Sequence, residues 1–214
     1  MNGIWLAYWA LSFFVGAIPF GYLLAKLFGG VDIRKKGSGN IGATNVTRLL
    51  GWKVGLPVLL LDIGKGAIAP LVGIYLLKTE FAFVPLVAGV LSVLGHMFSP
   101  FLLFKGGKGV ATSFGVFLVL TPFPVLVSLF VFLVLKKGFG FVSLGSIGGA
   151  IVLPISYYLF SIYSIIEYEA ITFYAICAVS CAILFLHRTN LVRLFKGREL
   201  LSNKEKYGDQ NLDE

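Results

Sequence analysis

Long apolar stretches separated by short polar ones make up most of this chain. A run of about twenty apolar residues is long enough to cross the hydrocarbon core of a bilayer as a helix. The run from 109 to 137 contains Pro122 and Pro124, and proline usually ends a helix just before its own position. We therefore divide that run into two short helices. The pattern predicts about seven helices, at 3–28, 54–77, 81–104, 109–121, 122–137, 139–166 and 169–186.

Positive charges along the chain predict the orientation of these helices. Lys and Arg are concentrated in the polar stretches 29–53, 105–108, 136–137 and 187–199, whereas the other two loops between predicted helices are acidic or nearly neutral. Because Lys and Arg favour the cytoplasmic side of a membrane, we expect the N-terminus outside and the C-terminus in the cytoplasm. A single unbroken helix over 109–137 would place two of the basic stretches outside, which also favours the break.

The composition excludes most other classes of protein. The 214 residues are 57% hydrophobic and only 13% charged, and the mean hydropathy is +0.90. A soluble domain is about a quarter charged, and a disordered chain is poor in apolar residues. We therefore predict an all-α polytopic integral membrane protein, with a single domain over 1–200 and a polar, flexible tail over 201–214.

The charged residues narrow the expected partners. The net charge of +8 suits cytoplasmic loops, whereas nucleic-acid binding would need a basic face on a soluble module, so no nucleic-acid partner is expected. Two histidines and two cysteines without ligand spacing predict no metal site, and we expect no cofactor. Asp62 and Lys65 stand inside a predicted span, where charges are costly. We expect a structural ion pair rather than a proton relay, because no acidic residue in the interior of another span continues one.

The first of three polar motifs, residues 36–48, alternates glycines with hydroxyl and amide side chains and ends on a guanidinium. Glycines let the backbone approach a ligand closely with its amide groups exposed. Arg48 can hold a phosphate through two parallel hydrogen bonds. An alternative is a polar loop that caps a helix beginning near Val46. The neutral candidate ligands are Ser38, Asn40, Thr44 and Asn45.

The second motif, residues 105–115, is a glycine-rich loop that runs into the start of a predicted helix. Free amides and the helix dipole at such a position favour an anion, and Lys108 adds a positive charge. The spacing differs from that of a Walker-type loop, and no predicted strand precedes it. An alternative is a helix break whose lysines only follow the cytoplasmic preference. The candidates here are Gly106, Gly107, Lys108, Gly109 and Thr112.

The third motif, residues 187–199, follows the last predicted span. On a continuing helix, His187, Asn190 and Arg193 would share one face through their spacing of three residues. His187 could equally be a capped residue at a helix interface. Glu199 is expected to pair with a neighbouring Arg or Lys.

In this order and apolar context, the three motifs together resemble the PlsY family, the bacterial membrane glycerol-3-phosphate acyltransferases that use acyl phosphate. The resemblance covers essentially the whole chain, and the predicted helix count agrees with the seven-helix fold that the family implies. It is carried by Ser38-Gly-Asn-Ile-Gly-Ala-Thr-Asn-Val-Thr-Arg48, by Gly106-Gly-Lys-Gly-Val-Ala-Thr112, and by His187-Arg-Thr-Asn190 with Gly197-Arg-Glu199.

The resemblance implies transfer of a fatty acyl group from acyl phosphate to the 1-hydroxyl of sn-glycerol-3-phosphate, the first acylation of phospholipid synthesis. The products would be 1-acyl-glycerol-3-phosphate (lysophosphatidate) and phosphate. It also implies a location in the bacterial cytoplasmic (inner) membrane, with the active site facing the cytoplasm. The implied partners are glycerol-3-phosphate, acyl phosphate and membrane lipid, with the enzyme that makes acyl phosphate as a further candidate.

Roles for the candidate residues follow from the resemblance and from their chemistry. The residues expected to be catalytic, by positioning a phosphate, the attacking hydroxyl or the acyl carbonyl, are Ser38, Arg48, His187 and Asn190. The residues expected to bind substrate are Asn40, Thr44, Asn45, Gly106, Gly107, Lys108, Gly109, Thr112 and Arg193. The proton acceptor is left open between His187 and an oxygen of the substrate's own phosphate. The alternative function is a transporter for a small phosphorylated metabolite, against which stands the lack of a clear internal repeat.

Overall fold

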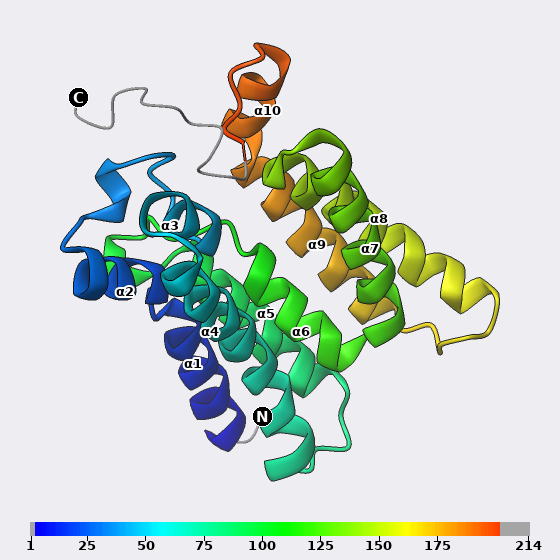
Figure 1. Cartoon of the computed structure of the whole chain (residues 1–214). Coiled ribbons are helices and arrows are strands. Elements are labelled where there is room, and N and C mark those ends of the chain that lie inside the picture. Colours follow the sequence, from blue (N-terminus) through cyan, green and yellow to red (C-terminus); the bar gives the residue numbers. More distant parts are fainter. Residues whose placement is uncertain (1–2, 202–214) are drawn as a thin grey trace.

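Residues 3–201 are described by the structure, a computed structural model of the chain (Figure 1). Within these residues every regular element is helical. The α-helices are α1 (Gly3–Ala17), α2 (Phe20–Gly29), α3 (Ala43–Leu50), α4 (Trp52–Leu71), α5 (Phe83–Met97), α6 (Val110–Leu120), α7 (Pro122–Phe139), α8 (Val142–Ile162), α9 (Ala170–Leu186) and α10 (Arg188–Phe195). Short 3-10 or π turns lie at Ile33–Lys35, Val72–Leu76 and Pro100–Leu102. Residues 202–214 lie outside the described part, so the flexible tail stays a prediction.

Each segment predicted to be helical contains a helix, and the break at the two prolines is confirmed. α6 ends at Leu120 and α7 begins at Pro122, a position where proline needs no helical N–H partner. Five segments are long and apolar enough to cross a membrane, or six if α9 and α10, bent by 52° at their junction, count as one. α6 has only 11 residues. The number of crossings and their orientation therefore stay predictions.

The first predicted helix, 3–28, is divided in two. α1 ends at Ala17 and α2 begins at Phe20. Pro19 stands between them, and proline has no N–H for the helical ladder and disfavours a helical backbone at Ile18. The hydropathy pattern does not reveal this break, because the residues on both sides of it are apolar.

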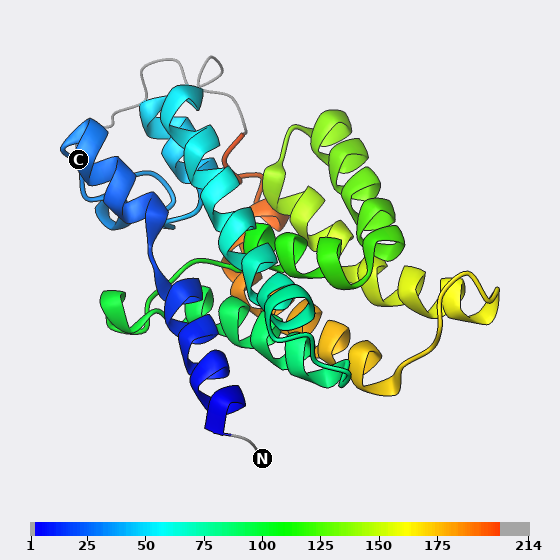
Figure 2. The same cartoon turned by 90° about the horizontal axis from the view of Figure 1, so that it is seen from below.

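The helices form two groups that meet along a shared core. α1 packs against α5 and α4 against α6, while α7 and α8 form a pair on which α9 lies. The view from below shows α1 and α2 on the opposite side of the molecule from α7 and α8 (Figure 2). Buried side chains of α5 to α9, among them Phe117, Leu153 and Ile176, form one apolar core that joins the two groups.

α4 and α6 approach closely because each carries a glycine where they cross. A Cβ on Gly66 would overlap the carbonyl group of Thr112, and a Cβ on Gly115 would overlap that of Ile63. Small residues at such crossings let the backbones of membrane helices come together. This contact fixes the start of α6, and so the loop before it, against α4.

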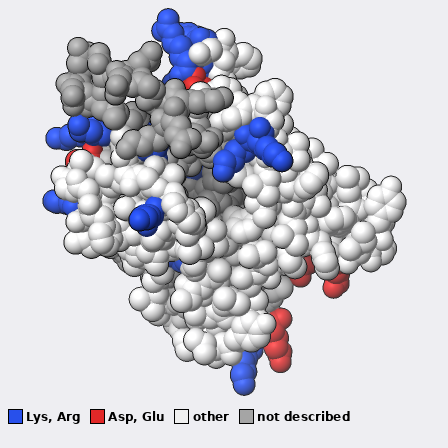
Figure 3. Space-filling view, viewed as in Figure 1, with Lys and Arg blue, Asp and Glu red and all other residues white. Residues whose placement is uncertain are grey.

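Lys and Arg side chains gather over one end of the molecule, around α3 and α10, and a hollow opens near them (Figure 3). Acidic side chains predominate at the opposite end of the same view (Figure 3). The polar motifs thus lie at the basic end, the end expected to face the cytoplasm.

Candidate functional site

One cavity of about 640 Å³ brings together residues from all three polar motifs. Residues of every helix from α3 to α10 contribute to its walls. The predicted site residues that line it are Ser38, Asn40, Thr44, Asn45, Arg48, Lys108, Gly109, His187 and Asn190. Four other predicted residues, Gly106, Gly107, Thr112 and Arg193, are not part of its lining.

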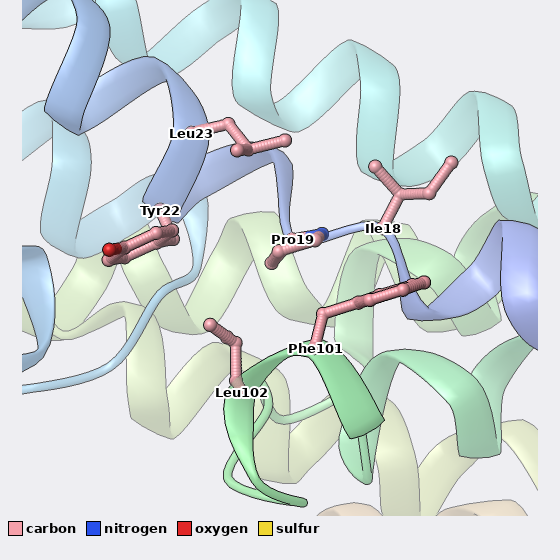
Figure 4. Close-up of a pocket in the computed structure, with 6 residues that line it drawn as sticks. All are labelled: Ile18, Pro19, Tyr22, Leu23, Phe101 and Leu102. Carbon is pink, nitrogen blue, oxygen red and sulfur yellow. The ribbon is translucent and has the colours of Figure 1, made fainter.

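A second cavity, of about 310 Å³, lies at the break between α1 and α2 (Figure 4). It is lined by Ile18, Pro19, Tyr22, Leu23, Phe101 and Leu102. Among these lining residues only Tyr22 has a polar side chain, so the lining provides no charge to hold a phosphate. The chemistry of the polar motifs therefore belongs to the larger cavity.

Asn45 organises the first motif from inside. Its side-chain amide donates to the carbonyl oxygens of Ile33, Lys36 and Asn40, at 3.3, 3.1 and 2.9 Å. Its Oδ1 accepts from the backbone N–H of Ser38 at 3.0 Å. Because both ends of this buried amide are used within the loop, Asn45 gives the loop its shape, and the loop places Ser38 and Asn40 in the cavity wall.

The glycines of this loop are explained by its backbone. Gly37 and Gly39 have φ angles of +61° and +70°, in the left-handed region that favours glycine. The alternative explanation, a polar loop that caps a helix, is right about the helix, since α3 begins at Ala43 and carries Arg48 in its last turn. Its N-cap, however, is Gly42, with no side-chain capping hydrogen bond. The motif therefore both starts a helix and lines the cavity.

The glycine-rich loop of the second motif is tied back to the end of α5. The N–H of Gly106 donates to the carbonyl oxygen of Met97 at 3.1 Å, and the N–H of Gly107 donates to that of His96 at 3.0 Å. These two amides are hydrogen-bonded within the protein, and the expected binding of a phosphate by these glycines stays a prediction. The loop presents Lys108 and Gly109 to the cavity, at the start of α6.

His187 stands at a bend, so the continuing helix considered for the third motif is interrupted there. α9 ends just before it and α10 begins just after it, at an angle of 52°. Its Nδ1 lies 2.8 Å from the carbonyl oxygen of Ile183. A carbonyl oxygen can only accept, so Nδ1 carries the hydrogen of this bond. In the neutral ring, Nε2 then holds the lone pair that a ligand can use.

A chain of hydrogen bonds joins the second motif to the third. Nζ of Lys108 donates to Oδ1 of Asn190, and Nδ2 of Asn190 donates to Oε1 of Glu199 at 2.6 Å. Nε of Arg193 donates to Oε2 of Glu199 at 2.9 Å, which confirms the expected pairing of Glu199 with a basic residue. Arg193 is not part of the cavity lining. It contacts Glu199, whose carboxylate in turn orients Asn190.

Burial and neighbouring charges shift two pKa values in this chain of contacts. Burial lowers the pKa of Lys108 to about 8, with the positive charges of Arg193 and Arg48 acting in the same direction and Glu199 opposing them. Burial by itself would raise the pKa of Glu199, but hydrogen bonds from Arg193 and Asn190 outweigh it and lower that pKa. At neutral pH, Lys108 is therefore mostly charged and Glu199 is ionised.

Much of the remaining cavity wall is apolar. These lining residues are Leu56, Leu59, Phe114, Val125, Leu129, Phe132, Leu133, Ala150, Leu153 and Ile183. Leu59 of α4 and Leu133 of α7 are also exposed, at 38% and 49%, so this side of the cavity reaches the apolar outer surface. The cavity combines cations and polar groups with an apolar wall, which suits a molecule with a polar head and an alkyl chain.

The cavity lining also includes residues that were not among the predicted site residues. Asp62, His96 and Ser113 line the cavity. Asp62 and Lys65 form the expected ion pair, with Nζ and Oδ1 2.8 Å apart. The signal for Asp62 was a charge inside an apolar span. Ser113 lines the cavity in place of its neighbour Thr112, which is fully buried with its backbone against Gly66 of α4.

The segment after the third motif also reaches the cavity. Leu200 is part of its lining, and the carbonyl oxygen of Leu201 accepts a hydrogen bond from Nε of Arg48 at 3.2 Å. The end of the described chain is therefore attached to α3, 153 residues away along the sequence.

Known proteins of one family match this chain. A family model described as glycerol-3-phosphate acyltransferase matches residues 6–197. A glycerol-3-phosphate acyltransferase of Leptospira borgpetersenii is 50% identical over 207 residues, covering 95% of this chain and 94% of that protein. Another, from Chlorobaculum tepidum, is 38% identical over 233 residues, covering 96% and 98%.

Two solved structures of PlsY, described as an integral membrane glycerol 3-phosphate acyltransferase, share the fold. The glycerol 3-phosphate form has a TM-score of 0.84 and 38% identity, and covers 95% of this chain and 98% of that one. The lysophosphatidic acid form has a TM-score of 0.81 and 37% identity, and covers 95% and 97%.

Proposed function

Because the chain belongs to the glycerol-3-phosphate acyltransferase family, we propose that it transfers a fatty acyl group from acyl phosphate to the 1-hydroxyl of sn-glycerol-3-phosphate. The products are 1-acyl-glycerol-3-phosphate and inorganic phosphate. The observation that carries the proposal is the one cavity in which Arg48, Lys108 and His187 share a wall with apolar side chains. Cations suit the phosphate of each substrate, and apolar side chains suit the acyl chain.

The reaction forms a bond from the 1-hydroxyl oxygen to the acyl carbonyl carbon and breaks the bond from that carbon to the phosphate oxygen. Phosphate is a good leaving group, so positioning and stabilisation of negative charge supply much of the catalysis. In this proposal Arg48 and Lys108 hold the two phosphates. Ser38 and Asn190 orient the hydroxyl and the acyl carbonyl.

The hydroxyl proton has two candidate acceptors. Nε2 of His187 is one, because the Nδ1 hydrogen of this residue is committed to Ile183. An oxygen of the departing phosphate is the other, and it needs no base from the protein. Replacement of His187 separates the two, because only the first loses its acceptor.

The proposal includes a bacterial inner-membrane location with the site facing the cytoplasm. The basic end around α3 and α10 supports this orientation, because Lys and Arg favour the cytoplasmic side (Figure 3). Glycerol-3-phosphate, small and polar, then enters from the cytoplasm, while the acyl chain is held beside lipid. The enzyme that makes acyl phosphate is the proposed protein partner.

The test is product formation by the purified full chain in detergent. Glycerol-3-phosphate is supplied with palmitoyl phosphate, palmitoyl-CoA or palmitoyl-acyl carrier protein in separate reactions. Lysophosphatidate from the acyl phosphate alone is the expected result. Product from the thioesters alone would refute the donor but keep the acyltransferase. No product from any donor, with glycerol-3-phosphate still bound, would refute the reaction and favour transport.

A further inference from the structure

Three buried polar side chains, Asp62, Lys65 and His96, have no role in the reaction described so far. Nζ of Lys65 lies 2.8 Å from Oδ1 of Asp62, and Nδ1 of His96 lies 3.7 Å from the same oxygen. Each side chain is at most 5% exposed. Charges inside an apolar bundle are costly and usually mark a function or face a cavity.

This cluster ties α4 to its neighbours. Nζ of Lys65 also donates to the carbonyl oxygen of Ile18, at 2.8 Å, where the chain breaks between α1 and α2. Oγ of Ser92 on α5 donates to the carbonyl oxygen of Lys65 at 3.0 Å. The contacts hold α4, α5 and the α1–α2 break together around His96.

His96 connects the cluster to the glycine-rich loop. Its carbonyl oxygen accepts the N–H of Gly107 at 3.0 Å. A Cβ on Gly107 would overlap Nε2 and Cε1 of the His96 ring. The imidazole therefore lies against the backbone of the residue directly before Lys108.

We propose that Asp62, Lys65 and His96 are positioning residues that form a buried brace for the glycine-rich loop. The Asp62–Lys65 pair fixes the His96 imidazole, the imidazole supports Gly107, and Gly107 sets where Lys108 enters the cavity. The inference rests on the proposed function, because it takes Lys108 to bind a substrate phosphate.

One observation and one general property of buried ion pairs distinguish this brace from a pair that only stabilises the fold. Asp62 and His96 line the same cavity as Lys108 and Asn190. In addition, apolar residues of similar volume often replace a buried ion pair without loss of stability. A brace therefore predicts weaker ligand binding in variants that keep their thermal stability.

The first experiment is a second-site rescue in the full chain, measured as the Kd for glycerol-3-phosphate by calorimetry in detergent. Gly107→Ala is expected to weaken binding at least about tenfold, because the new Cβ displaces the loop from the ring. His96→Ala removes the ring, so the double variant should bind several-fold more tightly than Gly107→Ala alone. His96→Ala alone should also weaken binding, because it removes the support of Gly107, and wild-type binding in that single variant overturns the proposal.

Gly106→Ala is the matched control for this rescue. Its Cβ would overlap the carbonyl oxygens of His96 and Met97, which are backbone atoms that no side-chain replacement removes. His96→Ala should therefore leave the binding defect of Gly106→Ala in place. If His96→Ala restores binding equally in both glycine variants, it acts by loosening the loop in general. That result would overturn the proposed contact between the His96 ring and Gly107. His96→Asn replaces His96→Ala in the same comparison if the latter does not stay folded.

The second experiment tests the charged pair. Asp62→Leu combined with Lys65→Leu removes both charges and is expected to keep the melting temperature within a few degrees, following the apolar replacement of buried pairs. The expected result is a Kd and a KM for glycerol-3-phosphate raised about fivefold or more with a smaller change in kcat, as for a displaced binding group. If this variant keeps the Kd and KM of the wild-type protein, Asp62 and Lys65 are not part of the brace. If this double variant does not stay folded, Asp62→Asn takes its place. The same result is then expected, a larger change in KM than in kcat.

The readouts separate this inference from the proposed function. Wild-type protein that binds glycerol-3-phosphate but makes no lysophosphatidate refutes the acyl transfer, whereas the brace is judged by Kd values that need no turnover. Wild-type protein that does not bind glycerol-3-phosphate refutes both.

Discussion

Nζ of Lys108 donates a hydrogen bond to Oδ1 of Asn190, a residue 82 positions further along the chain. This contact joins the glycine-rich loop to the bend after α9. Asn190 is held in turn by Glu199, and Glu199 by Arg193. The cation of one motif is thus positioned by the amide of another.

Replacement of Lys108 by Ala should weaken binding of glycerol-3-phosphate. Loss of one charge-assisted hydrogen bond corresponds to about 10–100-fold in KM. Steady-state kinetics with varied glycerol-3-phosphate measure this effect. Lys105→Ala is the control, because Lys105 lies in the same loop but is exposed and not part of the cavity lining. An unchanged KM in Lys108→Ala would exclude Lys108 from substrate binding.

The KM for glycerol-3-phosphate should rise with pH above about 8, because the pKa of Lys108 lies there. Below this pKa the ammonium is charged and attracts the phosphate. Above it the neutral amine does not. Arginine keeps its charge to much higher pH, so Lys108→Arg should show a flatter profile from pH 7 to 10. Identical profiles for the two proteins would contradict the assignment.

Replacement of His187 by Ala should lower kcat by about 100-fold if Nε2 accepts the hydroxyl proton. A change mainly in KM would instead assign the proton to the substrate's phosphate and leave His187 a binding role. Arg188→Ala is the control at the same bend, since Arg188 is exposed and donates to the carbonyl oxygen of Phe185. Loss of activity in both variants would indicate damage to the bend.

A larger side chain at Ala150 should shift the preference toward short acyl chains. Ala150 lines the apolar wall and is buried, so Ala150→Leu takes up space that the acyl chain would use. We expect the ratio of kcat/KM for palmitoyl phosphate to that for octanoyl phosphate to fall about tenfold, the effect of one to two kcal/mol. Overpacking of the protein lowers kcat/KM for both substrates alike, so it does not change this ratio.

Ile151→Phe is the matched control for chain length. Ile151 is the next residue on α8, is 46% exposed and is not part of the cavity lining. Its enlargement should leave the ratio of the two substrates unchanged. An unchanged ratio in Ala150→Leu would show that the acyl chain lies elsewhere.

The helical segments could be predicted because apolar length and proline position are local features of a sequence. Pro122 ended α6 as expected, whereas Pro19 divided the first segment without a change in hydropathy. For the site, the sequence indicated which residue types gather there, but it did not indicate which groups each side chain contacts. Asn45 is a polar residue of a polar motif, yet its amide is taken up by its own loop.

The sequence by itself determined the membrane class, most of the long helical segments and the three groups of polar residues, because each follows from local composition and spacing. Only the tertiary structure decided which of those groups meet. Lys108 contacts Asn190, the amides of Gly106 and Gly107 turn to α5, and Asp62 lies beside His96. These pairings depend on how helices distant in sequence pack, and that packing is set by side-chain shapes along whole helices rather than by any one motif.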